Sequence, residues 1–341
     1  MIHARPLRIA QYGTKHGHAA GKLESLRTNA RVECAGVFEP DAVRRAELQQ
    51  AGWPWQGVHW FGDAEQILGD PSIIAVAAEG RNDESLNQAE AIIRAGKHVW
   101  YDKPAGTDWQ QWQRVVALAE QHRLTIQMGY MFRYHAGFQQ IAEWAKSGLL
   151  GQIYAVRAQM STWISLEARR VIAVHPGGIF YDLAGHMLDQ IIWLLGRPVG
   201  VTSFFQDASG SVPGFQDHTL AVFSYQRALA SIEIAAIEVP PPARRFEVYG
   251  DCGSAIMEPF EPANPIRLCL NHATAGFQQG EQRIPIQNCS RQELYDRELT
   301  AFLGVITGER QPERPFAHDL LVQETLLRAT DHSRGVSYTP P

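Results

Sequence analysis

Short apolar runs alternate with longer amphipathic stretches over the first 130 residues. Between two such runs, the stretch from Glu84 to Ala95 has apolar residues at helical spacing and is followed by Gly96, a residue typical of the position just after a helix. Strands that alternate with helices predict a parallel sheet built from right-handed βαβ units. The predicted strands span residues 7–12, 32–38, 73–78, 98–101 and 125–129.

The pattern changes after a predicted linking helix over residues 134–146, where β-type runs become longer. A helix over 179–195 interrupts them and ends at Gly196. We therefore predict two domains, 1–130 and 131–341: an α/β domain with a doubly wound parallel sheet, then a sheet-rich α+β domain. The remaining predicted elements are a helix from a capping box at 107–110 to residue 122, strands over 152–163, 199–205, 219–225, 229–237 and 245–249, and closing helices over 293–307 and 319–331.

Composition is that of an ordinary globular chain of 341 residues, with 45% hydrophobic and 20% charged residues. The formal charge of −5 gives no electrostatic reason to expect nucleic acid or an acidic membrane as a partner, so a small molecule is favoured. The four cysteines are widely separated and form no CxxC pattern, and the first residues contain no apolar segment of signal-peptide length. We expect reduced thiols and a cytoplasmic location.

The most informative segment runs from Gly177 to His186, because Asp182 and His186 lie four residues apart in a predicted helix. That spacing places both on one helical face, where a carboxylate can orient an imidazole for proton transfer. The alternative is structural: the imidazole packs under the helix while the carboxylate complements the helix dipole.

The turn after the first strand, residues 13–18, lies where a dinucleotide-binding protein has its glycine-rich turn. Gly13 fits the first position of GxGxxG, Lys15 replaces the second glycine, and Gly17 is displaced by one from the third. Glu39, at the end of the second strand, is suited to accept the ribose hydroxyls of NAD and to repel the 2′-phosphate of NADP. The alternative is an ordinary turn and an exposed loop acid.

Lys103 follows the fourth predicted strand, in the segment Tyr101-Asp102-Lys103-Pro104. Ligands of open parallel sheets bind at the carboxyl ends of the strands, so this side chain would face the crevice. A buried lysine there can donate a proton or stabilise an alkoxide, whereas an exposed one would be solvated.

Four segments in this order give the chain its resemblance to the Gfo/Idh/MocA oxidoreductases, which include glucose-fructose oxidoreductase and inositol dehydrogenase. The resemblance covers nearly the whole length and is supported by Phe246-Glu247-Val248-Tyr249-Gly250 and by residues 323–327. The four segments are Ala95-Gly96-Lys97-His98-Val99 leading into Asp102-Lys103-Pro104, Gly129 to His135, Gly148 to Ile153, and Gly177 to His186.

The resemblance implies a Rossmann domain followed by an α/β domain with an open, predominantly antiparallel mixed sheet, assembled as a homodimer or homotetramer. It implies that Lys103, Asp182 and His186 are catalytic: His186 as general base, Asp182 as its orienting partner and Lys103 as polariser of the reacting oxygen, with the roles of Lys103 and His186 exchangeable. A cis Lys103–Pro104 bond is also expected.

The expected cofactor is NAD, with NADP second. Two departures from the family pattern lie on this side: the lost middle glycine, and Gly80-Arg81-Asn82-Asp83 where many members have Thr-Pro-Asn-His, of which only Asn82 carries over. His16 and His18 are expected to line the phosphate turn. The predicted cofactor-binding residues are Gly13, Thr14, Lys15, His16, Glu39, Asn82 and Lys103.

Four residues are candidates for contact with a carbohydrate-like substrate, because an aromatic wall with a few polar groups suits such a ligand. They are Arg133, His135, Trp163 and His175. Each has a structural alternative, as a core aromatic or a satisfied histidine. Asp182, His186 and His175 could suggest a metal, but the resemblance requires none and we predict none.

These observations predict an oxidoreductase that transfers a hydride between a nicotinamide cofactor and a sugar-like or polyol substrate. Two alternatives stay open: a glycoside hydrolase of the same fold that oxidises and re-reduces the sugar on one NAD, and a non-catalytic sensor or scaffold. The first would give cleavage with no net NADH, and the second would tolerate loss of Lys103 or His186.

Overall fold

The computed structural model describes residues 5–263 and 265–330. Within them the chain forms two compact units, residues 5–131 with 291–316, and residues 132–290 with 317–330. This division differs from the predicted ranges in one segment, because 291–316 packs with the first unit. In the part of the chain that is described, no helix has the length and apolar character needed to cross a membrane.

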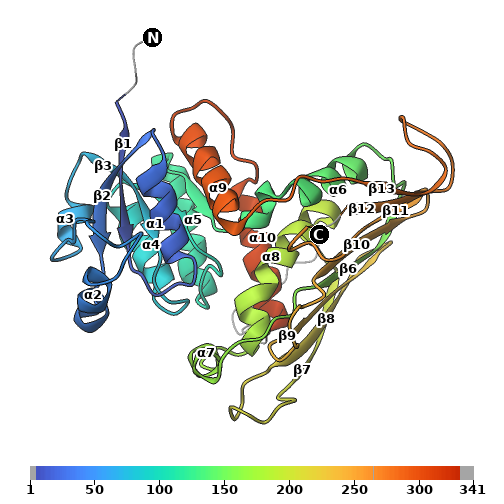
Figure 1. Cartoon of the computed structure of the whole chain (residues 1–341), viewed down its shortest axis with the longest axis horizontal. Coiled ribbons are helices and arrows are strands. Elements are labelled where there is room, and N and C mark those ends of the chain that lie inside the picture. Colours follow the sequence, from blue (N-terminus) through green and yellow to red (C-terminus); the bar gives the residue numbers. More distant parts are fainter. Residues whose placement is uncertain (1–4, 264, 331–341) are drawn as a thin grey trace. The chain divides into compact units, whose positions relative to one another are not determined.

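The first unit contains a parallel five-stranded sheet, as the alternating pattern predicted (Figure 1). The strand order is reversed between β1 and β3, so that the connections from these two strands leave in opposite directions. In such sheets this reversal opens a crevice at the carboxyl ends of the two strands. The strands, in spatial order, are β2 (Val32–Phe38), β1 (Leu7–Tyr12), β3 (Ile73–Ala78), β4 (His98–Tyr101) and β5 (Ile126–Met128).

Right-handed crossovers place α1 and α4 on opposite faces of this sheet. α9 lies beside α1 (Figure 1): the hydroxyl of Ser25 donates to Asp296 at 2.6 Å, and a Cβ on Gly21 would lie 2.6 Å from the ring of Tyr295. Asp108 caps α5, one residue later than the predicted capping box. The helices are α1 (Ala19–Thr28), α2 (Ala42–Gln49), α3 (Glu65–Leu68), α4 (Ser85–Arg94), α5 (Trp109–His122) and α9 (Arg291–Ile306).

The second unit contains an open mixed sheet of eight strands, in the order β13-β12-β11-β10-β6-β9-β8-β7. β6 and β9 are parallel and the other neighbours are antiparallel, as expected from the resemblance. The strands are β6 (Ile153–Gln159), β7 (Gly200–Gln206), β8 (His218–Ser224), β9 (Leu229–Ala235), β10 (Arg245–Gly250), β11 (Gly253–Met257), β12 (Ile266–Leu270) and β13 (Gly280–Ile284).

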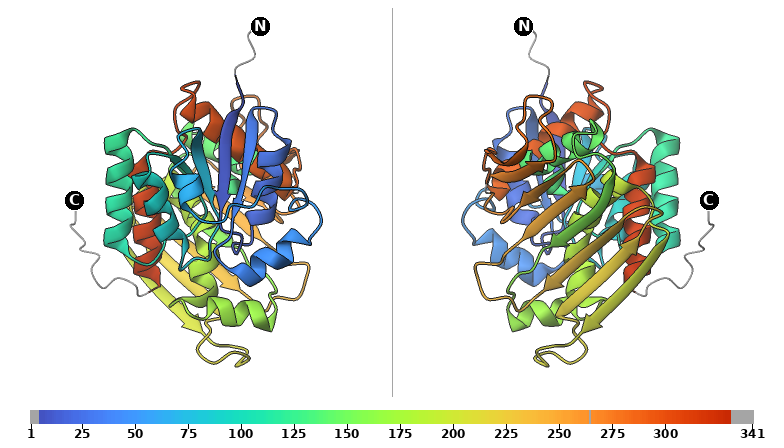
Figure 2. Two further views of the ribbon diagram at one scale, coloured as in Figure 1. Left: turned by 90° about the vertical axis from the view of Figure 1, so that its left-hand side faces the viewer. Right: turned by 90° about the vertical axis from the view of Figure 1, so that its right-hand side faces the viewer.

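Helix α8 (Gly178–Leu195) packs on β6, β8 and β9 and is covered by α6 (Ala136–Lys146) and α7 (Leu166–Ile172). Because α8 is enclosed by these elements, its buried residues lie around most of the helix rather than along a single stripe. The opposite face of the sheet carries no helix among the described residues (Figure 2, right). The short helix η1 (Met131–Tyr134) precedes α6, and α10 (Phe316–Ala329) is the last element of the described residues.

Candidate active site

The turn after β1 lies where the strand order reverses. Gly13 has a φ of +87°, a conformation that side chains rarely adopt, and a Cβ there would lie 2.7 Å from the amide nitrogen of Gly80. Its own N–H donates to the carbonyl of Phe38 at 2.7 Å. Glycine is therefore required at this position by backbone conformation and by the close approach of the turn to the end of β3.

Thr14 links this turn to the end of β2 through two charged residues. Its hydroxyl donates to Glu39 Oε2 at 2.6 Å and accepts from Arg44 Nε at 2.7 Å. Glu39 Oε1 accepts the N–H of Asp41 at 2.9 Å, and the residue is 1% exposed. The predicted ribose acceptor is thus buried rather than an exposed loop acid, and both of its oxygens are bonded within the turn.

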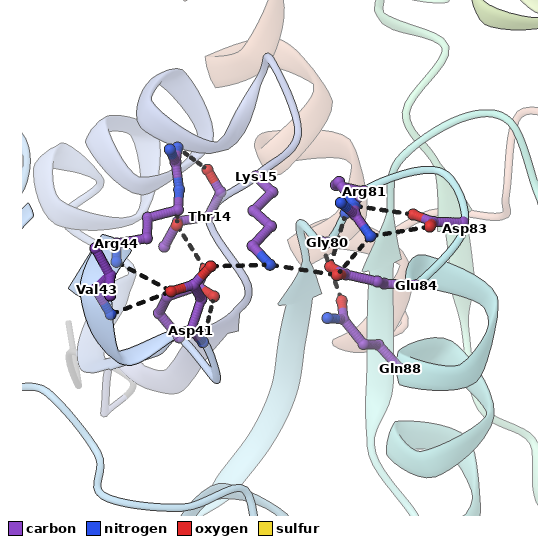
Figure 3. A network of polar contacts seen from close by, with 11 residues as sticks. Thr14, Lys15, Asp41, Val43, Arg44, Gly80, Arg81, Asp83, Glu84 and Gln88 are labelled. Atoms are coloured by element: carbon purple, nitrogen blue, oxygen red, sulfur yellow. Dashed lines mark hydrogen bonds and ion pairs between the residues drawn. The ribbon is translucent and has the colours of Figure 1, made fainter. Parts of the chain in front are cut away.

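Lys15 lies between Asp41 on the β2 side and Glu84 on the β3 side (Figure 3). Its ammonium lies 3.4 Å from Asp41 Oδ2 and 3.3 Å from Glu84 Oε1. Asn82 is partly exposed in the same loop as Glu84, where Arg81 pairs with Asp83 at 3.0 Å. The side chain that replaces the middle glycine therefore forms a bridge of ion pairs over the turn.

Beneath the turn lies a buried ionic cluster, which we call the strand-edge cluster: His16, His18, Lys22, Glu79 and Asp102. Asp102 Oδ2 lies 2.9 Å from His18 Nδ1, 3.0 Å from Lys22 Nζ and 3.2 Å from His16 Nδ1. Glu79 Oε1 lies 2.9 Å from Lys22 Nζ, and its Oε2 lies 3.6 Å from His16 Nδ1. The ion pairs of the strand-edge cluster thus join the turn after β1 and the start of α1 to the ends of β3 and β4.

Burial and charge oppose one another in the strand-edge cluster. Burial alone would lower the pKa of His16, but Asp102 and Glu79 raise it to about 9. Burial lowers the pKa of His18, which faces one carboxylate. Burial would raise the pKa of Asp102, yet His16, His18 and Lys22 hold it well below its usual range. The same carboxylates raise the pKa of Lys22 against its desolvation.

Lys103 lies two residues after the end of β4 at Tyr101 and is 3% exposed. Its backbone N–H donates to Asp102 Oδ1 at 2.8 Å, and its peptide bond to Pro104 is cis, as expected. Gly129 allows this arrangement, since a Cβ there would lie 2.6 Å from Asp102 Oδ1. The strand-edge cluster thus holds the backbone of the predicted catalytic lysine.

In the second unit, Asp182 and His186 lie one turn apart on α8, as their spacing predicted. Asp182 is partly exposed, whereas His186 is 2% exposed with its ring edge-on to Phe132 at 5.2 Å between centroids. The helix begins at Gly178 (φ +47°), where a Cβ would lie 2.5 Å from a backbone oxygen. A buried imidazole with a carboxylate one turn away can serve proton transfer.

Three predicted substrate residues lie in different surroundings. His135 caps α6: its Nδ1 accepts the N–H of Gly137 at 3.1 Å, and its ring lies 6.2 Å from that of Phe132, which also contacts His186. His175 stacks on Tyr181 at 4.7 Å, and Trp163 is 56% exposed. The structure therefore brings His135 near the α8 pair through a shared phenylalanine.

Arg133, the fourth predicted substrate residue, lies instead in a sealed ion-pair network, which we call the helix network. Its Nε and Nη2 donate to Asp189 Oδ1 at 2.9 and 2.6 Å, and Nη2 donates to Asp319 Oδ1 at 2.5 Å. His318 Nε2 lies 2.8 Å from Asp189 Oδ1. Because its guanidinium is 5% exposed and held by two carboxylates, we drop Arg133 from the substrate-binding set.

Two family models match this chain. An oxidoreductase family with an NAD-binding Rossmann fold matches residues 8–130, and the GFO/IDH/MocA C-terminal domain matches residues 138–256. The chain belongs to the Gfo/Idh/MocA family. Its first unit is the family's NAD-binding domain, and the open mixed sheet of its second unit is the family's C-terminal fold.

Individual members of the Gfo/Idh/MocA family share a modest part of their sequence with this chain. The uncharacterized oxidoreductase YdgJ of Escherichia coli is 30% identical over 62% of this chain and 61% of its own length. The 1,5-anhydro-D-fructose reductase of Ensifer adhaerens is 24% identical over 73% of this chain and 74% of its own. A levoglucosan dehydrogenase in complex with NADH and levoglucosan superposes with a TM-score of 0.82 over 98% of both chains at 16% identity, which shows a common fold.

The residues at the first unit's crevice fit the dinucleotide of the Gfo/Idh/MocA family in two respects. Gly13, with its positive φ, lets the turn pack tightly against the end of β3, the role of the first glycine in dinucleotide-binding turns. Lys15 supplies a partly exposed ammonium at that turn, suited to a phosphate. The bridge from Lys15 to Asp41 and Glu84 would have to open for that contact.

Sequence reasoning missed the ion-pair partners in both units. His18 was expected only to line the turn, and Lys22, Glu79, Asp189 and His318 carried no prediction, because their partners are distant in sequence. Two groups of ligand-type atoms lie within 4.8 Å of one another, one in each network. Lys22 already pairs with the carboxylates of the first group, and Arg133 with those of the second. We therefore assign no metal to either group.

Proposed function

We propose that this chain is a nicotinamide-dependent dehydrogenase that oxidises or reduces a CH–OH carbon of a sugar-like or polyol substrate. The observation that carries the proposal is the α8 pair, Asp182 and His186, in a chain whose first unit is an NAD-binding Rossmann domain of the family. The similarity to a 1,5-anhydro-D-fructose reductase and to the fold of a levoglucosan dehydrogenase supports a carbohydrate substrate.

Three side chains divide the proton chemistry. His186 takes the hydroxyl proton of the substrate as its carbon is oxidised, and returns it in the reverse direction. Asp182, one turn away, orients that imidazole and favours its charged form. The ammonium of Lys103 stabilises negative charge on the reacting oxygen. The bound nicotinamide supplies the hydride acceptor or donor, and Gly13, Thr14, Lys15 and Asn82 would hold the cofactor.

Preference for NAD over NADP is part of the proposal. Glu39 and Asp41 place two carboxylates on the β2 side of the turn, where a 2′-phosphate would meet negative charge. The positive charge of Arg44 would attract a 2′-phosphate, although two of its nitrogens already donate hydrogen bonds to Thr14. Glu39→Gln removes one charge without changing size, so it should narrow the difference in affinity between NADH and NADPH.

The first test is a fluorescence titration with NADH and NADPH, followed by a screen of sugars and polyols. Saturable binding and substrate-dependent NADH formation support the proposal, whereas no binding by nucleotide-free protein would contradict it. Glycoside cleavage with no net NADH would instead identify the hydrolase alternative. His186→Ala and Lys103→Met should each lower kcat by about 10²- to 10³-fold. His122→Gln, on the exposed end of α5, is the matched control.

Assembly and location complete the proposal. The open face of the second unit's sheet presents Tyr154, Phe204 and Leu229, each more than half exposed, and we propose that it is covered in a homodimer or homotetramer. Light scattering during size-exclusion chromatography tests this. None of the four cysteines is in a disulfide, which suits the proposed cytoplasmic location.

A further inference from the structure

Asp102 connects the turn after β1 to the predicted catalytic lysine. One carboxylate oxygen, Oδ2, contacts His16, His18 and Lys22 at 3.2, 2.9 and 3.0 Å. The other, Oδ1, accepts the backbone N–H of Lys103 at 2.8 Å. Any change in the charge held around Oδ2 therefore acts on the group that fixes the backbone of Lys103.

The two imidazoles are not equivalent in this arrangement. His16 Nδ1 faces two carboxylates, at 3.2 Å from Asp102 and 3.6 Å from Glu79, whereas His18 Nδ1 contacts Asp102. The ring centroids are 4.6 Å apart, so one proton on the pair disfavours a second. The geometry selects His16 as the ring that is protonated first.

One contact argues for the neutral form of His16. The backbone N–H of His18 points to the same Nδ1 atom at 3.2 Å, and that bond needs a lone pair on the nitrogen. An unprotonated Nδ1 would, however, direct this lone pair at two buried carboxylates. Nδ1 therefore carries a proton, and because the neutral tautomer protonated at Nδ1 alone would leave the buried carboxylates under-compensated, the imidazolium is favoured.

Charges from the neighbouring elements point the same way. Glu79 at the end of β3, Asp102 at the end of β4 and Glu298 on α9 are buried carboxylates, 0%, 2% and 0% exposed. Lys22 on α1 is a buried cation that faces all three. Lys103 adds a positive charge near His18, and Tyr295 on α9 lies 5.2 Å from the His18 ring. A second buried cation, His16, brings the cluster closer to neutrality.

We propose that His16 is a positioning residue: as an imidazolium it holds Asp102, and through Asp102 it fixes the backbone of Lys103. The catalytic role of Lys103 rests on the proposed function, whereas the coupling of His16 to the backbone of Lys103 does not. The pKa of His16, raised to about 9 by Asp102 and Glu79 against its desolvation, agrees with a protonated ring at neutral pH. Deprotonation above that pH would loosen the hold on Lys103.

The coupling is measured directly on the backbone amide of Lys103. The chain has five lysines, so labelling with ¹⁵N-lysine gives five backbone signals, and Lys103→Arg assigns the one of interest. We expect this signal to shift between pH 7 and 10 with a midpoint near 9 in the wild-type protein and in His122→Gln. In His16→Gln the pH-dependent shift should disappear, while the signals of Lys97 and Lys146, which lie outside the strand-edge cluster, keep their wild-type behaviour.

Glu79→Gln provides a second variant if His16→Gln does not fold. It keeps the imidazole and removes one of its two carboxylates, so the midpoint should fall by a unit or more. A Lys103 signal that does not change with pH, or one that still titrates in His16→Gln, would overturn the proposal. So would one equivalent of zinc bound through His16 in the purified protein, since the ring would then be a neutral ligand.

These outcomes are independent of turnover. If NADH does not bind but the Lys103 signal follows His16, the proposed function fails and the coupling stands. If the enzyme is active but the Lys103 signal is independent of His16, the coupling fails and the proposed function stands. In the active enzyme, His16→Gln should lower kcat and move the alkaline limb of the pH profile.

Discussion

The strand-edge cluster and the helix network contain nearly the same chemistry in different settings. Each has a buried cation, two carboxylates and at least one histidine. In the second unit Arg133 donates three hydrogen bonds from a planar guanidinium, and Asp189 accepts on both oxygens, Oδ2 from the amide of Gln190 at 2.9 Å. These charged hydrogen bonds of fixed geometry hold η1, α8 and α10 together.

In the first unit the cation is Lys22, a point charge with no fixed fork, and two imidazoles complete the contacts. Their side chains are 8% and 14% exposed, against 6% for His318 in the helix network. The cluster also lies at the carboxyl edge of a parallel sheet, where ligands bind. The difference teaches that similar buried charges are structural when a guanidinium fork closes them in a fixed geometry, and adjustable when an ammonium and two imidazoles share them.

The largest expected effect is on the helix network. Arg133→Met leaves Asp189 and Asp319 with no guanidinium, and breaking a buried pair of this kind costs about 3–5 kcal/mol. We expect that loss in the free energy of unfolding at pH 7, measured by urea titration. Arg94→Met, an exposed pair on α4, should cost less than 1 kcal/mol. A loss below 1 kcal/mol in Arg133→Met would show that the network does not stabilise the fold.

The next effect separates the two regions by pH. The pKa of His16 rises from its ordinary 6.5 to about 9 in the folded chain, so its stabilising contribution is complete below pH 6.5 and is lost as pH rises to 9. That contribution is on the order of 3 kcal/mol. Native-state hydrogen exchange, corrected for intrinsic rates, should show α1 and α9 losing protection over this window while α8 and α10 keep theirs. Equal losses in both pairs of helices would contradict the comparison.

A smaller and pH-dependent loss is expected for Lys22→Met. We expect about 2 kcal/mol at pH 7, less than for Arg133→Met, because His16 remains as a cation beside the carboxylates. The loss should be smaller at pH 6 than at pH 8, since His18, whose pKa is lowered by burial, takes up a proton more readily at the lower pH. Lys146→Met, an exposed control, should change stability by less than 0.5 kcal/mol. A loss independent of pH would show that the histidines do not compensate.

The smallest effect on stability is expected for Lys15→Ala. Its two ion pairs are partly exposed, the Asp41 side chain to 40%, and are worth less than about 1 kcal/mol together. The NADH dissociation constant should nevertheless rise about tenfold, because a charge-assisted contact to a phosphate is lost. Unchanged affinity would remove Lys15 from the cofactor site and leave it as a bridge between α2 and α4.

Local pattern was sufficient for the elements that carry the proposed chemistry. The helix with Asp182 and His186, and the strand end before Lys103, follow from period and spacing within a few residues. The strands β11, β12 and β13 were missed, and β13 has no buried residue that would mark it as a strand. The strand predicted over 152–163 ended at Gln159, since the apolar run continues into a loop before α7.

The ionic partners could not be found in this way. Arg133 meets carboxylates 56 and 186 residues away, and His18 meets one 84 residues away. A charged residue in a sequence gives no signal of a partner at such separations, so Arg133 was taken for a ligand-binding group. Glu39 was placed at the right strand end, but its burial depends on Thr14 and on a backbone N–H that spacing does not reveal.

The position of α9 has a consequence for how the protein is made. Its partners in the first unit, including Ser25, are synthesised early, while α9 itself ends at residue 306. At a translation rate of 5–20 residues per second, the nascent first unit waits roughly 10 to 35 seconds for the helix that completes it. During that interval the face of α1 that receives Tyr295 is uncovered. The NAD-binding domain is thus finished only after most of the second unit has left the ribosome.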